Sequence, residues 1–205
     1  MQAVYRLIIS IIAFLSSTVA FPLTSEQQKV IEEIEKDVIS SPQMLGTFSQ
    51  KKTLSQLPRP LVSSGVLAIS ESLGLSWRIE SPIESHRIFK IDNSESEHRS
   101  SNGIIENLIA DSLLQIINGD FSKLGRTYIL SPYFEQEQWR IKLTPKQNSF
   151  RRIIESIEIA GDQKIRKIIL SEANMSLTEI DIVDLQPVNP DNRQLLNEFA
   201  EDKQK

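Results

Sequence analysis

The strongest constraint on the fold is a long series of short segments with the pattern of extended chain, separated by Gly, Pro, Ser and Asn. Residues 139–143 show the pattern most clearly, because Trp139, Ile141 and Leu143 alternate with charged residues and would share one face of a strand. The other segments predicted as strands are 45–51, 61–70, 75–79, 87–91, 153–159, 164–170 and 175–185. Strands that follow one another through short turns favour an antiparallel sheet.

Two helices are predicted beside these strands. In the first, apolar residues recur at helical spacing between Glu26 and Val38, after a capping serine and before a proline. In the second, residues 104–117 place apolar side chains on one side, and an Asn-Gly pair follows. This second helix would be either a lid or plug on one face of the sheet or an ordinary packed helix, and the pattern favours neither. The predicted fold class is α+β.

One folded domain is predicted between two terminal segments. Residues 1–20 have the layout of a secretory signal peptide, with Arg6 before a short apolar run and small residues at its end. The alternative is an uncleaved membrane helix, for which the run is short against ~30 Å of hydrocarbon. Residues 21–190 would form the domain. Residues 191–205 would be a C-terminal tail, which is either a short helix or an unstructured end.

The charge balance and the lack of cysteine narrow the function classes. Removing residues 1–20 takes away one of the 23 bases, Arg6, and none of the 27 acids, which leaves 22 bases and a net charge of −5. A mildly acidic chain is unlike nucleic-acid readers, which usually carry a basic face. Because cysteine is absent, the chain has no disulfide and no thiolate ligand, and an exported domain of this kind depends on its hydrophobic core.

The sequence lacks the patterns of common catalytic and metal sites. His86 and His98 are its two histidines, and both stand among polar residues without metal-ligand spacing. Glu135 and Glu137 would be a general-acid pair or, as their neighbours favour, part of an exposed turn. No Gly-rich phosphate loop or nucleophile elbow is present. We therefore expect a binding protein rather than an enzyme, without metal or cofactor.

Three sequence blocks carry a family resemblance. Residues 46–52 read Gly-x-Phe-x-Gln-x-Lys, residues 64–69 contain a Ser-Gly pair followed by leucine, and residues 75–82 read Leu-x-Trp-x-x-x-x-Pro. In this order they resemble the periplasmic outer-membrane lipoprotein carrier (LolA) family, of which the chain would be a divergent member from residue 24 to about residue 185. The resemblance implies an incomplete, half-open antiparallel β-barrel that helices cover on its concave side.

The resemblance also implies a function and partners. The protein would be a soluble periplasmic carrier that shields the acyl chains of lipoproteins in an apolar cavity and transfers them towards the outer membrane. Shielding is favourable because burial of each CH₂ is worth ~0.8 kcal/mol. An inner-membrane ABC-type exporter would load the carrier, and an outer-membrane acceptor lipoprotein would unload it. We expect the carrier to be a monomer.

The predicted lipid-binding site is an apolar set on the inner face of the sheet and on the covering helix. For any single member ordinary core packing is the favoured interpretation, so the prediction concerns a cavity made by the set. The set comprises Phe48, Leu67, Ile69, Trp77, Phe89, Ile91, Leu108, Ile109, Leu113, Trp139, Ile141 and Leu143.

One position departs from the family pattern. Members of the family carry an arginine followed by a proline after the second block, and that arginine latches the lid through hydrogen bonds. The corresponding residues here are Glu71 and Ser72. A carboxylate has the opposite charge and cannot donate as a guanidinium does. Any latch in this chain must therefore differ from that of the family.

Two further functions stay open. The same fold would carry another amphiphile, such as a glycolipid or a polyene-type lipid. Alternatively, the protein is a non-lipid interaction module of the cell envelope. The mark of such a module would be a filled barrel, without a cavity between Trp77, Trp139 and the helix of residues 104–117.

Overall fold

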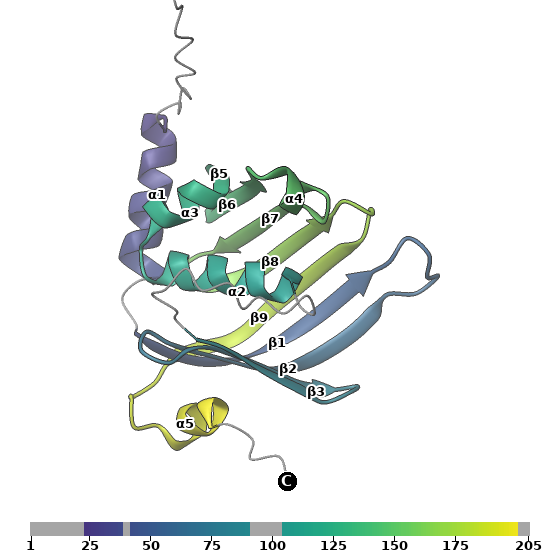
Figure 1. The fold of residues 1–205 in the computed structure, drawn as a ribbon. Coiled ribbons are helices and arrows are strands. Elements are labelled where there is room, and N and C mark those ends of the chain that lie inside the picture. Colours follow the sequence, from purple (N-terminus) through teal and green to yellow (C-terminus); the bar gives the residue numbers. More distant parts are fainter. Residues whose placement is uncertain (1–22, 39–41, 91–103, 201–205) are drawn as a thin grey trace, which may run out of the picture.

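The computed structural model describes residues 23–38, 42–90 and 104–200 (Figure 1). Their main element is a nine-stranded antiparallel sheet in the order β4-β3-β2-β1-β9-β8-β7-β6-β5. The strands are β1 (Gln43–Thr53), β2 (Leu61–Ser70), β3 (Gly74–Ser81), β4 (Ser85–Phe89), β5 (Tyr128–Glu135), β6 (Gln138–Pro145), β7 (Ile154–Gly161), β8 (Ile165–Glu172) and β9 (Leu177–Pro187). The expected antiparallel sheet is confirmed.

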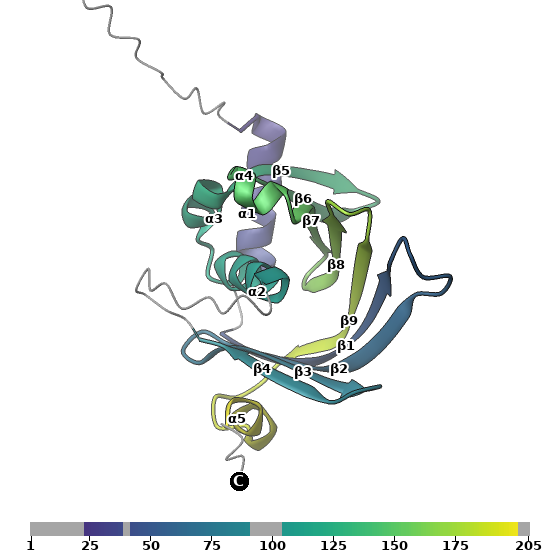
Figure 2. The ribbon, with the colours of Figure 1, turned by 45° about the vertical axis from the view of Figure 1, so that its right-hand side comes forward.

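The sheet curves into an open C, and its two edge strands, β4 and β5, do not pair with each other (Figure 2). Helices α1 (Ser25–Val38), α2 (Ile104–Ile117) and α3 (Phe121–Thr127) lie on its concave side. Helix α1 contacts β5 and β6, α2 contacts β3 and β4, and the two helices contact each other. They therefore bridge the two arms of the C. The predicted class, an α+β fold with a half-open barrel covered by helices, is confirmed.

Helix α2 lies within the concave space rather than on the surface. Its side chains Leu108, Leu113 and Ile116 are fully buried, and the hydroxyl of Ser112 donates to the carbonyl oxygen of Leu108 at 2.7 Å. The internal bond satisfies a polar group that the surrounding apolar side chains cannot. Between the two interpretations that the sequence left open, the structure favours a plug on the concave face, which is also part of the core.

The β5–β6 hairpin explains the two glutamates that the sequence left undecided. Gln136 and Glu137 form its turn with φ angles of 50° and 64°, the left-handed pair that two-residue hairpins require. Glu135 ends β5, and its carboxylate lies 2.9 Å from Arg140 Nη2. Both glutamates are exposed. The favoured interpretation, an exposed turn, is confirmed.

The last described helix lies on the convex face of the sheet. A short helix α4 (Asn148–Arg151) connects β6 to β7, and α5 (Arg193–Phe199) packs against β3 from outside (Figure 1). Asn192 caps α5 by accepting from the Leu195 N–H at 3.0 Å, and Leu195 is buried. Of the two alternatives for the C-terminal tail, the structure has the helix, because these residues find both a cap and an apolar surface.

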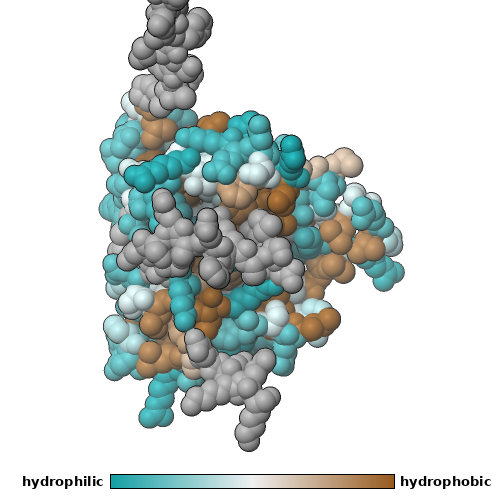
Figure 3. All heavy atoms as spheres, in the orientation of Figure 1, coloured by the Kyte–Doolittle hydropathy of each residue, from teal (hydrophilic) through white to brown (hydrophobic). Residues whose placement is uncertain are grey.

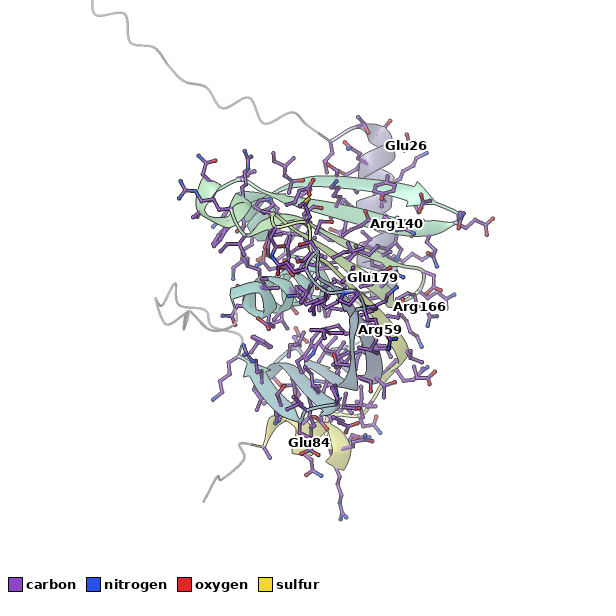
Figure 4. All side chains as sticks on the ribbon, turned by 90° about the vertical axis from the view of Figure 1, so that its right-hand side faces the viewer. Glu26, Arg59, Glu84, Arg140, Arg166 and Glu179 are labelled. Atoms are coloured by element: carbon purple, nitrogen blue, oxygen red, sulfur yellow. The ribbon has the colours of Figure 1, made fainter. Side chains whose placement is uncertain are left out.

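The remainder of the convex face carries charged side chains in networks (Figure 4). Glu179 lies between cavity-facing Thr178 and Ile180 in sequence, so strand alternation turns it outward. Its carboxylate is 3.8 Å from Lys51 Nζ and 3.7 Å from Lys167 Nζ. Arg140 pairs in the same way with Glu158 at 2.6 Å. These ion pairs place charged side chains of β1, β6, β7, β8 and β9 on the side away from the cavity.

Candidate ligand-binding cavity

A cavity of about 170 Å³ lies between the first turns of α2 and the concave face of the sheet. Strands β1, β3, β4, β8 and β9 form its floor and walls. The residues that line it are Gln50, Lys52, Trp77, Ile79, Ser85, Arg87, Phe89, Ile105, Glu106, Ile109, Leu170, Thr178 and Ile180. The cavity therefore lies between the sheet and the helix of residues 104–117.

Strand alternation aims the apolar wall into the cavity. In the β3–β4 hairpin, Trp77 pairs with Arg87 and Ile79 with Ser85, so these four side chains point to the same face. Trp77 also contacts Phe48, with 4.5 Å between the ring centroids and the two ring planes tilted by 44°. The indole therefore packs against a buried side chain of β1.

Helix α2 supplies the opposite wall. Ile105 and Ile109 are four residues apart and so lie on one side of the helix, above the sheet. Ile105 is half-buried, whereas Ile109 is buried. The first turn of α2 is thus less enclosed than its later turns, which fill the core.

The other half of the lining is polar. Lys52 Nζ lies 2.8 Å from Glu172 Oε1 in an ion pair whose side chains are 30% and 7% exposed. Between them in the sheet, Thr178 is buried, and its Oγ1 has no hydrogen-bond partner in the part of the chain that the structure describes. Arg87 and Glu106 are exposed at the rim. The lining therefore mixes apolar and polar side chains, so the cavity suits a hydrocarbon chain together with a polar group.

The size limits what the cavity holds in this conformation. It is comparable to an engineered cavity of about 150 Å³ that takes one benzene molecule, and smaller than the ~300–1,000 Å³ of drug-sized pockets. It has room for a segment of one acyl chain. A larger cargo would require α2 to move away from the sheet.

An exposed apolar surface adjoins the cavity. Leu61 pairs with cavity-lining Lys52 and shares its face, yet its side chain is 53% exposed. Leu57 and Val62 in the same hairpin are also exposed, and apolar residues show at the surface in this region (Figure 3). Of these residues Leu61 shares the face of the cavity, whereas Val62 pairs with the outward-facing Lys51 and lies on the convex face.

The predicted lipid-binding residues divide into two groups. Trp77, Phe89 and Ile109 line the cavity. The others within the described residues are buried in the core: Phe48, Leu67, Ile69, Leu108, Leu113, Trp139, Ile141 and Leu143. Ile91 lies outside the described residues. The cavity borders Trp77 but not Trp139, whose indole N–H instead donates to the Asp162 carbonyl at 2.5 Å.

The polar lining was not predicted from the sequence, although strand alternation alone indicates part of it. Phe48 faces inward, so alternation along β1 places Gln50 and Lys52 on the same face. The same rule applied to Trp77 gives Ile79. Thr178 carries no such signal, because its place beside Lys52 follows from the pairing of β1 with β9.

Glu71, at the position of the family's latch arginine, lies in the turn between β2 and β3. Its side chain is exposed and forms no hydrogen bond or ion pair with any described residue. Only its backbone is engaged, since its N–H donates to the Pro42 carbonyl at 2.8 Å. Within the described chain Glu71 does not latch α2.

The histidines occupy no metal site in the described chain. His86 faces the convex side, where its Nε2 lies 2.8 Å from Ser76 Oγ. His98 is outside the described residues. Across residues 23–38, 42–90 and 104–200, no three His, Asp or Glu side chains gather as metal ligands would. Within the same residues, no helix combines the length and the apolar character needed to cross a membrane.

No family model and no curated protein matches the sequence. Solved structures do match the fold. A LolA superfamily protein from Nitrosomonas europaea is 10% identical over 81% of this chain and 95% of its own, with a TM-score of 0.40. An outer membrane lipoprotein-sorting protein domain from Vibrio parahaemolyticus is 10% identical over 83% and 94%, with a TM-score of 0.39. The MucA/MucB complex of Pseudomonas aeruginosa gives 14% identity over 83% and 60%, with a TM-score of 0.45. All three superpose loosely on this chain.

Proposed function

We propose that this protein is a periplasmic carrier that shields the acyl chains of lipoproteins and transfers them towards the outer membrane. The observation that carries the proposal is the cavity between α2 and the concave sheet, with Trp77, Phe89 and Ile109 in its apolar wall. The signal-peptide layout of residues 1–20 and the three family-like sequence blocks support the same function. Carriage requires no bond to be made or broken, so the protein would need no catalytic group.

The energetics of carriage fit a cavity of this kind. Each CH₂ removed from water contributes about 0.8 kcal/mol, so several methylenes suffice for a stable complex. Release requires the favourable free energy of burying these methylenes to be overcome. A movable cover permits this because the chain can leave the cavity gradually. The first turn of α2 is the candidate cover, because Ile105 and Glu106 are less buried than Leu113 and Ile116 further along.

The handover partners follow from the family resemblance. An inner-membrane ABC-type exporter would place the cargo in the cavity, and an outer-membrane acceptor lipoprotein would take it. The exposed apolar residue Leu61, which shares the face of cavity-lining Lys52, lies where a chain would pass during such a transfer. If the cargo is instead another amphiphile, such as a glycolipid or a polyene-type lipid, the same cavity would hold it.

Native mass spectrometry tests the proposal. The chain without residues 1–20 is purified from the periplasm in the absence of detergent, and any ligand is released by denaturation. A lipoprotein or its acylated fragment supports the proposal. A different amphiphile would show that the protein is a carrier with another cargo. A bare polypeptide that also takes up no fluorescent fatty acid contradicts carriage and favours the interaction module.

A matched pair of variants locates the binding site. Ile105→Trp places a larger side chain at the cavity mouth, where the native side chain is half-buried, and should weaken uptake of a fluorescent fatty acid. Ile129→Trp makes the same change at an exposed position on β5 away from the cavity lining, and should leave uptake unchanged. Equal effects of the two variants would place the binding site elsewhere.

A further inference from the structure

The polar half of the cavity contains a hydroxyl group whose hydrogen bond the described residues do not supply. Thr178 is only 5% exposed, it lines the cavity, and its Oγ1 has no partner within the described chain. Buried hydroxyl groups of native proteins nearly always have a hydrogen-bond partner. A polar atom of a ligand is the partner that a binding cavity provides.

The sheet register defines the surroundings of this hydroxyl. Thr178 pairs with Lys52 of β1 on one side and with Leu170 of β8 on the other. The hydroxyl thus stands at the boundary between an ammonium group and the apolar wall. The Lys52 ammonium has three N–H donors, and Glu172 Oε1 lies 2.8 Å from it.

The Thr178 hydroxyl, the Lys52 ammonium and the nearby carboxylates restrict which polar group of a ligand can bind beside them. Lysine only donates, and a threonine hydroxyl donates readily, so the ligand atom between them must be an acceptor. A cationic head group would be repelled by the Lys52 ammonium. A phosphate with two charges would meet the carboxylates of Glu172 and Glu106, which balance the charges of Lys52 and Arg87. A carbonyl oxygen, neutral or with a single charge, fits both restrictions.

We propose that Thr178 and Lys52 bind the carbonyl end of an acyl chain, while the adjoining methylenes lie against Trp77, Phe89 and Ile180. This inference rests on the proposed carrier function and names the group that orients the cargo. The acyl carbonyl occurs both as the carboxylate of a free fatty acid and as the ester of a lipidated protein. The cavity of about 170 Å³ holds such an end together with the first part of one chain.

The test compares two fluorescent probes that differ at the polar end. Parinaric acid carries a carboxylate on an acyl chain, whereas diphenylhexatriene is a hydrocarbon without any polar atom. Thr178→Val keeps the shape of the side chain and removes the hydroxyl, and Thr178→Ser keeps the hydroxyl. Loss of one hydrogen bond should weaken parinaric acid binding by about three- to tenfold in Thr178→Val. Diphenylhexatriene binding should be unchanged, and Thr178→Ser should retain affinity for parinaric acid.

The outcomes separate this inference from the proposed function. Equal binding of parinaric acid to the native chain and to Thr178→Val, or equal weakening of both probes, would overturn the carbonyl site and leave the carrier intact. A native chain that binds neither probe would overturn the carrier itself. The methyl ester of parinaric acid separates the two sources: tighter binding of the acid indicates a free fatty acid, and equal or tighter binding of the ester indicates a lipidated protein.

A measurement on the native chain covers the case in which Thr178→Val does not fold. Palmitic acid labelled with ¹³C at its α-methylene should show nuclear Overhauser contacts to the Thr178 methyl group. Contacts from the terminal methyl of the chain to Thr178 instead would reverse the orientation and overturn the inference.

Discussion

Arg78 and Glu198 join the sheet to the last helix through two parallel contacts, although 120 residues separate them in the chain. Arg78 Nη2 lies 2.7 Å from Glu198 Oε1, and Nε donates to Oε2 at 2.9 Å. This fork geometry is the strong form of an arginine–carboxylate pair. Because the glutamate is buried and the arginine half-buried, the pair fixes α5 on the convex face behind the cavity wall.

Replacement of Arg78 should therefore destabilise the fold. Arg78→Met leaves the Glu198 carboxylate buried without its partner, which we expect to cost about 2 kcal/mol, less than a fully buried pair because the arginine is partly exposed. The measurement is urea unfolding. Arg59→Met, at an exposed arginine without a described ion pair, is the control and should unfold as the native chain does. Equal midpoints of urea unfolding for the two variants would mean that the Arg78–Glu198 pair does not contribute to stability.

Two adjacent lysines offer a sharper comparison on β1. Lys52 points inward to the buried Glu172, whereas Lys51 points outward and lies 3.8 Å from Glu179 with more than half of its side chain exposed. Lys52→Met should lower the free energy of unfolding by about 1–3 kcal/mol, because it strands a buried carboxylate. Lys51→Met should change it by less than about 0.5 kcal/mol. The opposite order in urea unfolding would show that the inner pair is not the stronger one.

Glycines in the sheet and in a helix should respond in opposite directions to the same substitution. A Cβ at Gly65 would lie 1.8 Å from the Arg78 carbonyl oxygen across the β2–β3 pair. Gly65→Ala should therefore cost about 3 kcal/mol or more through forced backbone shifts. A Cβ at Gly125 in α3 meets only a leucine methyl at 3.9 Å. Gly125→Ala should raise stability by about 0.5–1 kcal/mol. Thermal unfolding of both variants gives the comparison.

The sequence predicted those elements whose patterns are local. Strand β2 has the predicted bounds, 61–70, and both long helices lie where the apolar spacing placed them. Strand β5 was missed, because its residues 128–135 do not alternate and include Pro132. A proline is tolerated there since β5 is an edge strand, but only the finished sheet shows which strand is at the edge.

The lining of the cavity coincides with the predicted lipid-binding set only at Trp77, Phe89 and Ile109. Trp139 and Ile141 have the same alternation as Trp77, yet α1 packs against β6 and turns them into core. Which apolar residues remain beside a cavity depends on where the helices dock, and the pattern of one strand does not contain that information. The polar lining could not be predicted in full from the pattern of any one strand. Thr178 and Lys52 meet only through the pairing of β1 with β9.

Asp162 should make stability depend on pH in the acid range. Burial alone would raise the pKa of this carboxyl group, but hydrogen bonds from Arg166 Nε and the Lys164 N–H outweigh it and lower the pKa. Because this pKa is lowered in the folded chain, the Asp162 carboxylate stabilises the fold at pH values above the pKa that the group has in the unfolded chain. The contribution is lost as the pH falls below about 4 and through the folded-state pKa. Asp162→Asn should be less stable than the native chain at pH 7, and the difference should shrink towards pH 2. A difference that stays constant across this range would contradict the assignment.

The two tryptophans of the chain should report ligand binding differently. Trp77 lines the cavity and is half-buried, whereas Trp139 is fully buried outside the cavity lining, with its N–H bonded to the Asp162 carbonyl. An acyl ligand in the cavity removes water from Trp77 and should shift its fluorescence to shorter wavelength, without changing the surroundings of Trp139. Trp139→Phe should therefore keep the emission change that palmitic acid produces, and Trp77→Phe should lose it. If the change instead disappears in Trp139→Phe, the ligand lies deeper in the barrel than this cavity. α2 must then leave the core on binding rather than shift only its first turn.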